Sequence, residues 1–100
     1  MSKNRIYELT VLIHPQLEED ARKQLVEQIT KMVSVGEGAD EQIAVTHWGS
    51  RSMAYEIKNS REAYYVYFEG PMDGSKIREV ERQFTYNDDI LRYLFVRKED

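Results

Sequence analysis

Cysteine is absent from this chain of 100 residues, and several other features are scarce. The lack of cysteine excludes a disulfide framework and any metal site built on thiolates. No apolar run approaches the roughly 20 residues that a membrane-spanning helix needs. The first five residues contain no apolar core of the kind that a signal peptide requires. We therefore expect an intracellular protein without a membrane partner.

A basic excess is also missing, because 18 acidic residues outnumber 14 lysines and arginines and give a net charge of −4. Neutralisation of phosphates, with release of their counterions, supplies most of the affinity of nucleic-acid-binding proteins. Any RNA binding by this chain must therefore be local, through a few basic residues on one edge, with a second protein completing the surface. The hydrophobic content of 41% is typical of a globular protein, so we expect one domain over residues 1–100.

Apolar periodicity predicts a strand and a helix in the first third of the chain. Alternation from Tyr7 to Ile13 indicates a strand, which Pro15 ends because proline lacks a backbone donor. An apolar stripe at helical spacing follows over residues 21–33. Acidic residues in the first turn of this segment suit a helix N-terminus, and glycines at positions 36 and 38 are expected to end the helix.

A long hairpin is predicted next, with strands over about residues 41–58 and 62–69. The polar residues between these strands have the composition of a turn. Gly49, an interior strand glycine, predicts a bulge, and Gly70-Pro71 is expected to break the second strand of the hairpin.

A second helix, capped by Asp73 or Ser75, and a last strand over residues 90–97 complete the predicted elements. The order β-α-β-β-α-β is that of the split βαβ arrangement. The sequence therefore predicts an α+β, ferredoxin-like fold, with a four-stranded antiparallel sheet and two helices on one face.

The sequence contains no group of residues that predicts catalysis or metal binding. The two histidines, His14 and His47, are far apart and have no neighbouring set of ligands. Acylphosphatases share the predicted topology, but they need a phosphate-binding loop with a basic residue, and the loop at residues 14–17 contains neither glycine nor arginine. We expect no enzyme, no cofactor, no metal and no small-molecule substrate.

Residues 48–58 form the most informative stretch of the chain. A glycine is followed two positions later by a basic residue and then by the run Met-Ala-Tyr-Glu-Ile-Lys at residues 53–58. This stretch resembles the bacterial small-subunit ribosomal protein six family, in which a leucine stands in place of Met53. The opening Tyr7-Glu8 and the tail over residues 86–97 extend the resemblance to nearly the whole chain.

The resemblance implies a non-catalytic constituent of the small ribosomal subunit, cytoplasmic and ribosome-associated. It also implies two partners that bind cooperatively, the small-subunit ribosomal RNA and small-subunit ribosomal protein eighteen. An acidic protein gains little from RNA alone, whereas a basic partner supplies positive charge and covers apolar surface. The alternative is a ferredoxin-like interaction or regulatory module that self-associates through its sheet and binds no RNA.

Candidate RNA-binding residues follow from the predicted sheet. Because the first strand is expected between the third and the fourth, basic residues of several strands are expected to share an edge and reach phosphates there. A solvated surface charge is the other interpretation of each residue. Tyr55 is instead expected to pack in the core. The predicted RNA-binding residues are Arg5, Arg51, Lys58, Arg92 and Arg97.

The sheet face without helices is the candidate protein-binding surface. Along the third strand, Tyr65 and Tyr67 point opposite to Tyr64, Val66 and Phe68, so both faces carry apolar or aromatic side chains. Large exposed apolar patches are uncommon on monomers, which favours a partner; the alternative is that curled strands bury both rows. The predicted partner-binding residues are Trp48, Tyr64, Val66 and Phe68.

Overall fold

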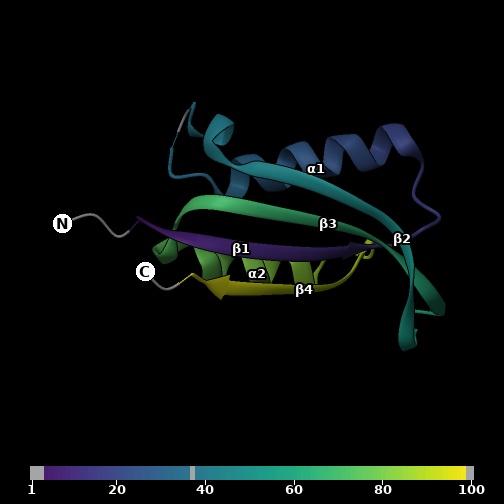
Figure 1. Ribbon diagram of the computed structural model, residues 1–100. Helices are drawn as coiled ribbons and strands as arrows, with labels where there is room; N and C mark the ends of the chain where they lie inside the picture. Colours follow the sequence, from purple (N-terminus) through teal and green to yellow (C-terminus); the bar gives the residue numbers. More distant parts are fainter. Residues whose placement is uncertain (1–3, 37, 99–100) are drawn as a thin grey trace.

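Four antiparallel strands form one sheet with the order β2-β3-β1-β4, and two helices cover one of its faces (Figure 1). The computed structural model describes residues 4–36 and 38–98; the other positions of the domain predicted over residues 1–100 lie outside the described residues. The elements are β1 (Asn4–Ile13), α1 (Glu19–Val33), η1 (Ala39–Gln42), β2 (Ala44–Ile57), β3 (Ser60–Asp73), η2 (Gly74–Lys76), α2 (Ile77–Thr85) and β4 (Ile90–Arg97). The predicted α+β, ferredoxin-like fold is confirmed, including the place of β1 between β3 and β4.

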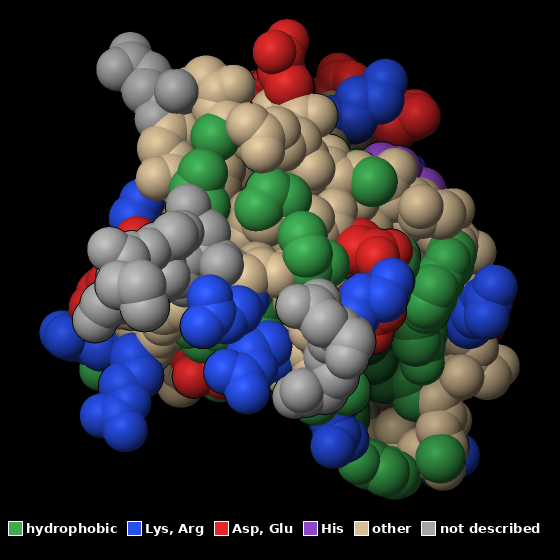
Figure 2. Space-filling view, turned by 60° about the vertical axis from the view of Figure 1, so that its left-hand side comes forward, with side chains coloured by type: hydrophobic (Ala, Val, Ile, Leu, Met, Phe, Trp, Pro, Cys, Tyr) green, Lys and Arg blue, Asp and Glu red, His purple; other side chains and the backbone are tan. Residues whose placement is uncertain are grey.

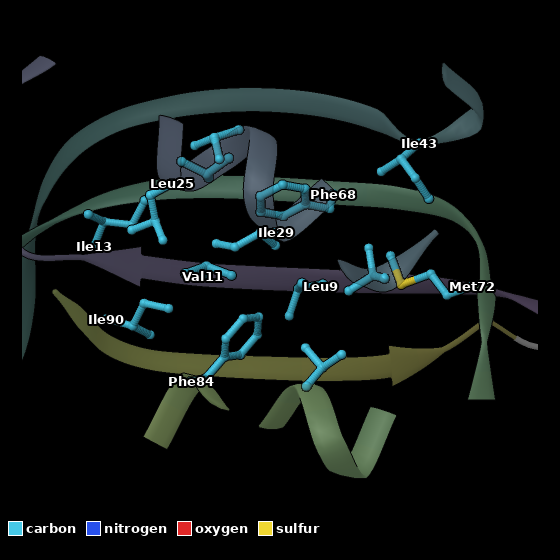
Figure 3. Close-up of a cluster of buried hydrophobic side chains, with 14 residues drawn as sticks. Leu9, Val11, Ile13, Leu25, Ile29, Ile43, Phe68, Met72, Phe84 and Ile90 are labelled. Atoms are coloured by element: carbon cyan, nitrogen blue, oxygen red, sulfur yellow. The ribbon is translucent and has the colours of Figure 1, made fainter. Parts of the chain in front are cut away.

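The core lies between the sheet and the two helices (Figure 3). Leu9, Val11 and Ile13 alternate along β1 and are completely buried, which is the period expected of a strand with one covered face. Ile29 of α1 and Phe84 of α2 pack against them from the two helices. The apolar stripes that the sequence shows therefore define which face of the sheet the helices cover.

The ends of the helices depend on short side chains rather than on glycine. Helix α1 ends at Val33, before the glycines that were expected to stop it, and the Ser34 hydroxyl donates a hydrogen bond of 3.0 Å to the Lys31 carbonyl. Asp73 accepts a hydrogen bond of 3.0 Å from the Ser75 backbone and so caps η2, which leads into α2. Within the described residues, neither helix has the length and apolarity needed to cross a membrane.

Strand β3 is longer than the sequence predicts, because it continues through Gly70 and Pro71 to Asp73. The neighbouring strand β2 begins only at Ala44, opposite Glu69, so beyond this point β3 has a partner on one side. Proline is tolerated where a strand has a free edge, which explains why Pro71 does not end β3. A Cβ on Gly70 would lie 2.6 Å from the carbonyl oxygen of Gln42, and this close approach requires glycine.

The bulge predicted at Gly49 is present in β2. His47 pairs with Val66, whereas Gly49 pairs with Tyr65, so Trp48 is an extra residue without a partner in β3. Gly49 has a φ of +85°, a conformation that side chains rarely adopt and that glycine adopts without strain. The bulge therefore changes the alternation of side chains along β2 at Trp48.

A second irregularity separates the tip of the β2–β3 hairpin from the rest of the sheet. Ser52 pairs with Glu62 and Ile57 pairs with Ser60, so residues 53–56 of β2 stand opposite Arg61 alone. The turn itself has positive φ at both central residues, Lys58 and Asn59, as in a type I′ turn. In Figure 1 this tip bends past the end of the sheet towards the side of β4. We refer to residues 53–59 as the hairpin tip.

Candidate nucleic-acid and protein interface

The face of the sheet opposite the helices, referred to below as the open face, combines apolar and charged side chains. The strand register places Glu8 beside Glu69 and Val96, and Thr10 beside Tyr67 and Leu94. Several large apolar side chains are exposed here, including Leu94 at 60% and Val96 at 43%. The residues of the open face are Ile6, Glu8, Thr10, Leu12, Trp48, Tyr65, Tyr67, Glu69, Arg92, Leu94 and Val96.

The prediction that Val66 and Phe68 bind a partner is wrong, because both side chains are completely buried. They pair with Val11 and Leu9 of β1 and belong to the core beneath the helices. Both rows of β3 are aromatic or apolar, so the alternation shows that two faces exist but not which of them the helices cover. The row that faces away from the helices is that of Tyr65 and Tyr67.

Tyr64 also lies on the helix side of the sheet and packs against the core with part of its ring exposed. The guanidinium carbon of Arg22, on α1, lies 3.8 Å from the centre of the Tyr64 ring. The Tyr64 hydroxyl and the Nδ1 atom of His47 are 3.0 Å apart. Tyr64 therefore joins α1 to the sheet and does not lie on the open face as a partner residue.

Trp48 lies on the open face, where the bulge directs it. Its ring stacks on Tyr67 with the centroids 5.1 Å apart and an angle of 11° between the planes. The guanidinium carbon of Arg51 lies 5.5 Å from the centre of the Trp48 ring, within the range of a cation–π interaction. Trp48 is 40% exposed, so the stack offers a rigid aromatic surface to a partner.

The hairpin tip brings β2 to β4, although these strands are the two edges of the sheet. The Arg92 guanidinium of β4 donates a hydrogen bond to the Tyr55 hydroxyl of the tip. Tyr55 is 56% exposed, so the expectation that it packs in the core is wrong. A groove of about 160 Å³ lies between the tip and the sheet and is lined by Leu12, Met53, Ala54, Tyr55, Ile57, Tyr65 and Arg92.

The side chain of Lys58, at the turn of the hairpin, forms hydrogen bonds with main-chain carbonyls elsewhere in the protein. Its ammonium donates a hydrogen bond of 3.0 Å to the Ile90 carbonyl and one of 3.5 Å to the Asn87 carbonyl. The Asn87 carbonyl belongs to the turn between α2 and β4, and the Ile90 carbonyl belongs to the first residue of β4. Lys58 therefore fastens the hairpin tip to the start of β4, which favours a structural role over the predicted contact with RNA.

The five predicted RNA-binding residues do not share one edge. Arg51 lies on β2, whereas Arg92 and Arg97 lie on β4, the opposite edge of the sheet. Arg5 is in β1, an inner strand, opposite Met72 of β3. The prediction correctly placed β1 between β3 and β4 but overlooked that β2 then becomes the other edge. The Arg51 side chain contacts Trp48 of the open face, and the Arg92 side chain contacts Tyr55 of the hairpin tip.

Two carboxylates and a lysine form a charged group near the other end of the open face. Lys98 donates a hydrogen bond to Glu69, which holds the pKa of the Glu69 carboxyl below its ordinary value. The same contact raises the pKa of the Lys98 ammonium. Burial raises the pKa of the Tyr67 hydroxyl strongly, and the neighbouring carboxylates of Glu8 and Glu69 raise it further.

Comparison with known proteins identifies the family. The sequence pattern described as "Ribosomal protein S6" matches residues 6–97 of the chain. The chain belongs to the ribosomal protein S6 family. The expectations of a non-catalytic protein of the small ribosomal subunit, associated with ribosomes in the bacterial cytoplasm, are thereby confirmed at the level of the family.

Individual members of the ribosomal protein S6 family resemble the chain along nearly its whole length. It is 35% identical over 96 residues to small ribosomal subunit protein bS6 of Heliobacterium modesticaldum, covering 96% of the chain and 98% of that protein. The corresponding protein of Moorella thermoacetica is 36% identical, with 96% of each covered. The crystal structure of 30S ribosomal protein S6 from Thermotoga maritima superimposes with a TM-score of 0.79 at 31% identity, covering 96% of the chain and 89% of that protein.

The stretch by which the sequence resembles the ribosomal protein S6 family is largely the hairpin tip. Tyr55 and Lys58 each contact the region where β4 begins, through the Arg92 side chain and through main-chain carbonyls respectively. The sequence alone did not predict these two contacts. Residues 53–56, where the pairing with β3 is interrupted and the tip turns towards β4, contain no glycine or proline that would indicate such a change.

Proposed function

We propose that the chain binds small-subunit ribosomal RNA cooperatively with small-subunit ribosomal protein eighteen. The protein partner covers the part of the open face around Ile6, Leu94 and Val96, and RNA phosphates contact Arg51 and Arg92. The main support is a group of apolar side chains, Ile6 of β1 and Leu94 and Val96 of β4, which are 40%, 60% and 43% exposed on the sheet face opposite the two helices. An exposed apolar group of this kind is typical of an interaction surface.

The positions of the arginines support the RNA part of the proposal. Both Arg51 and Arg92 are exposed, and each is held near an aromatic ring, that of Trp48 or that of Tyr55. Arginine so placed presents a planar fork of donors that matches phosphate oxygens. Two such residues give a small basic footprint in a chain whose net charge is −4. The RNA affinity of the chain alone is therefore weak, and the protein partner supplies the remaining positive charge.

The test measures RNA binding with and without protein eighteen. We expect weak, salt-sensitive binding by the chain alone and tight binding by the pair, because each partner raises the apparent affinity of the other by one coupling free energy. Equally tight binding by the chain alone would contradict the cooperative part of the proposal. A chain that forms dimers in sedimentation and never binds RNA with protein eighteen would favour the self-associating alternative.

Arg92→Ala tests the assignment of the phosphate contact, with Arg78→Ala on the exposed side of α2 as the matched control. Loss of one phosphate contact reduces the slope of log affinity against log salt by about 0.9. We expect this reduction for Arg92→Ala and an unchanged slope for Arg78→Ala. An unchanged slope for Arg92→Ala, with normal affinity, would show that the RNA binds elsewhere.

A further inference from the structure

Two like charges face each other on the open face, at the level where β4 ends. Glu8 of β1 and Glu69 of β3 are direct neighbours in the strand register. Carboxylates in such a cross-strand position repel each other and destabilise the sheet. The chain places a cation of its own here, because Lys98, directly after β4, donates a hydrogen bond to Glu69. The lysine side chain nevertheless remains about half exposed.

Apolar side chains surround the two carboxylates. Val96 is directly opposite Glu8 on the other side of β1, and Ile6 precedes Glu8 by two residues on the same face. Both apolar side chains are about two-fifths exposed. Figure 2 shows the corresponding pattern, in which an acidic and a basic group touch beside a row of hydrophobic side chains. A side chain with an aliphatic stem and a cationic head would contact both kinds of surface at once.

We propose that this end of the open face binds an arginine or lysine side chain of the protein partner, which takes the place of Lys98 on Glu69. The inference rests on the proposed function, in which the open face is covered by a basic protein. The stem of the incoming side chain covers Ile6 and Val96, and its head bonds Glu69 and Glu8. Lys98, released from Glu69, then faces solvent.

Two further features support this exchange. The bond between Lys98 and Glu69 is exposed to solvent, and exposed ion pairs contribute little to stability, so displacement of the lysine costs little. The opposite charge of Arg92, four residues further along the face at the level of Leu12, disfavours the partner's cation there. Complementary charge at one end and like charge at the other would fix the direction in which the partner lies on the sheet.

The experiment measures the affinity of purified protein eighteen for four forms of the full chain. These forms are the wild type, Lys98→Met, Glu69→Gln and the double variant. Lys98→Met removes the competing cation, so we expect binding to tighten roughly two- to fivefold at low salt, in line with the strength of exposed ion pairs. Glu69→Gln should weaken binding, and Lys98→Met should give no gain in the Glu69→Gln background. Lys23→Met, on the exposed side of α1, is the matched control and should change nothing.

The inference would be overturned by two results together: Lys98→Met binds protein eighteen no more tightly than the wild type, and Glu69→Gln binds it normally. If Lys98→Met does not fold, Glu8→Gln decides instead, since weaker binding supports the exchange and normal binding contradicts it. A wild-type chain that does not bind protein eighteen, with or without RNA, refutes the proposed function itself and the inference with it. A homodimer of the free chain that Glu69→Gln dissociates would overturn the inference by assigning the carboxylates to a second copy.

Discussion

Replacement of Lys58 by methionine tests whether this lysine stabilises the fold or binds RNA. Methionine keeps most of the aliphatic length but removes the ammonium, and with it the bonds of 3.0 Å to Ile90 and 3.5 Å to Asn87. Hydrogen bonds from charged groups contribute about 1.5–3 kcal/mol, and solvent at this partly exposed site reduces the expected loss to about 1 kcal/mol. For a chain of this size, that loss lowers the melting temperature by roughly 4–8 °C.

Lys58→Gly isolates the backbone contribution at the same position. The φ of +49° costs a residue with a side chain about 1 kcal/mol or more, whereas glycine adopts it freely. Relief of this strain roughly offsets the lost hydrogen bonds, so we expect Lys58→Gly to melt close to the wild type and above Lys58→Met. Thermal and urea melts of the three forms provide the measurement, with Lys23→Met as the control.

Two results would refute the reasoning about Lys58. A Lys58→Met variant as stable as the wild type would show that the bonds to the Asn87 and Ile90 carbonyls contribute nothing. A variant of normal stability whose RNA affinity falls, with a salt slope reduced by about 0.9, would instead make Lys58 a phosphate ligand. The structural interpretation requires the opposite combination, namely lower stability with an unchanged salt slope once the chain is folded.

The remaining predictions concern the two faces of the sheet and the charged pair. Val66→Asp should destabilise the fold by about 3–5 kcal/mol, because it buries a charge. Leu94→Asp should change the stability by less than about 0.5 kcal/mol but reduce the binding of protein eighteen. Equal melting midpoints of the two variants would contradict the assignment of the two faces. In an NMR titration the pKa of Glu69 should lie below its ordinary value and rise towards it in Lys98→Met. Glu69 contributes stability that is present above its unfolded-state pKa and is lost as the pH falls through its lower folded-state pKa. Lys98→Met should reduce this loss, because it removes the first cause of the lowered pKa.

The order of elements was predictable because apolar periodicity is a local property of the sequence. Tyr7 to Ile13 alternate, the segment of α1 shows a helical stripe, and Gly49 marks a bulge that only a residue without a side chain forms easily. The choice of face was not predictable in the same way. Both rows of β3 are aromatic, so the covered row is determined by helices that are distant in sequence.

The contacts of the hairpin tip show a second limit of sequence reasoning. Lys58 bonds to a carbonyl 32 residues further along the chain, and Arg92 bonds to a tyrosine 37 residues before it. Neither pair has a local signal, since each depends on how residues 53–56 leave the ladder with β3. Basic residues are also common on protein surfaces. The residue type alone therefore does not show that Lys58 fastens the tip, whereas Arg92 is partly exposed to solvent.

The net charge of −4 and the proposed RNA binding are compatible because the charges of the open face are separated. Glu8 and Leu12, which mark the levels of the acidic pair and of Arg92, are four residues apart on β1. At about 3.4 Å per residue this separation is about 14 Å, longer than the Debye length of about 8 Å at physiological salt. Each end of the face therefore interacts with its partner almost independently of the other end. A cation of the protein partner and a phosphate of the RNA can then bind one small sheet together, and their separation along the strands, rather than the total charge, determines which end each partner contacts.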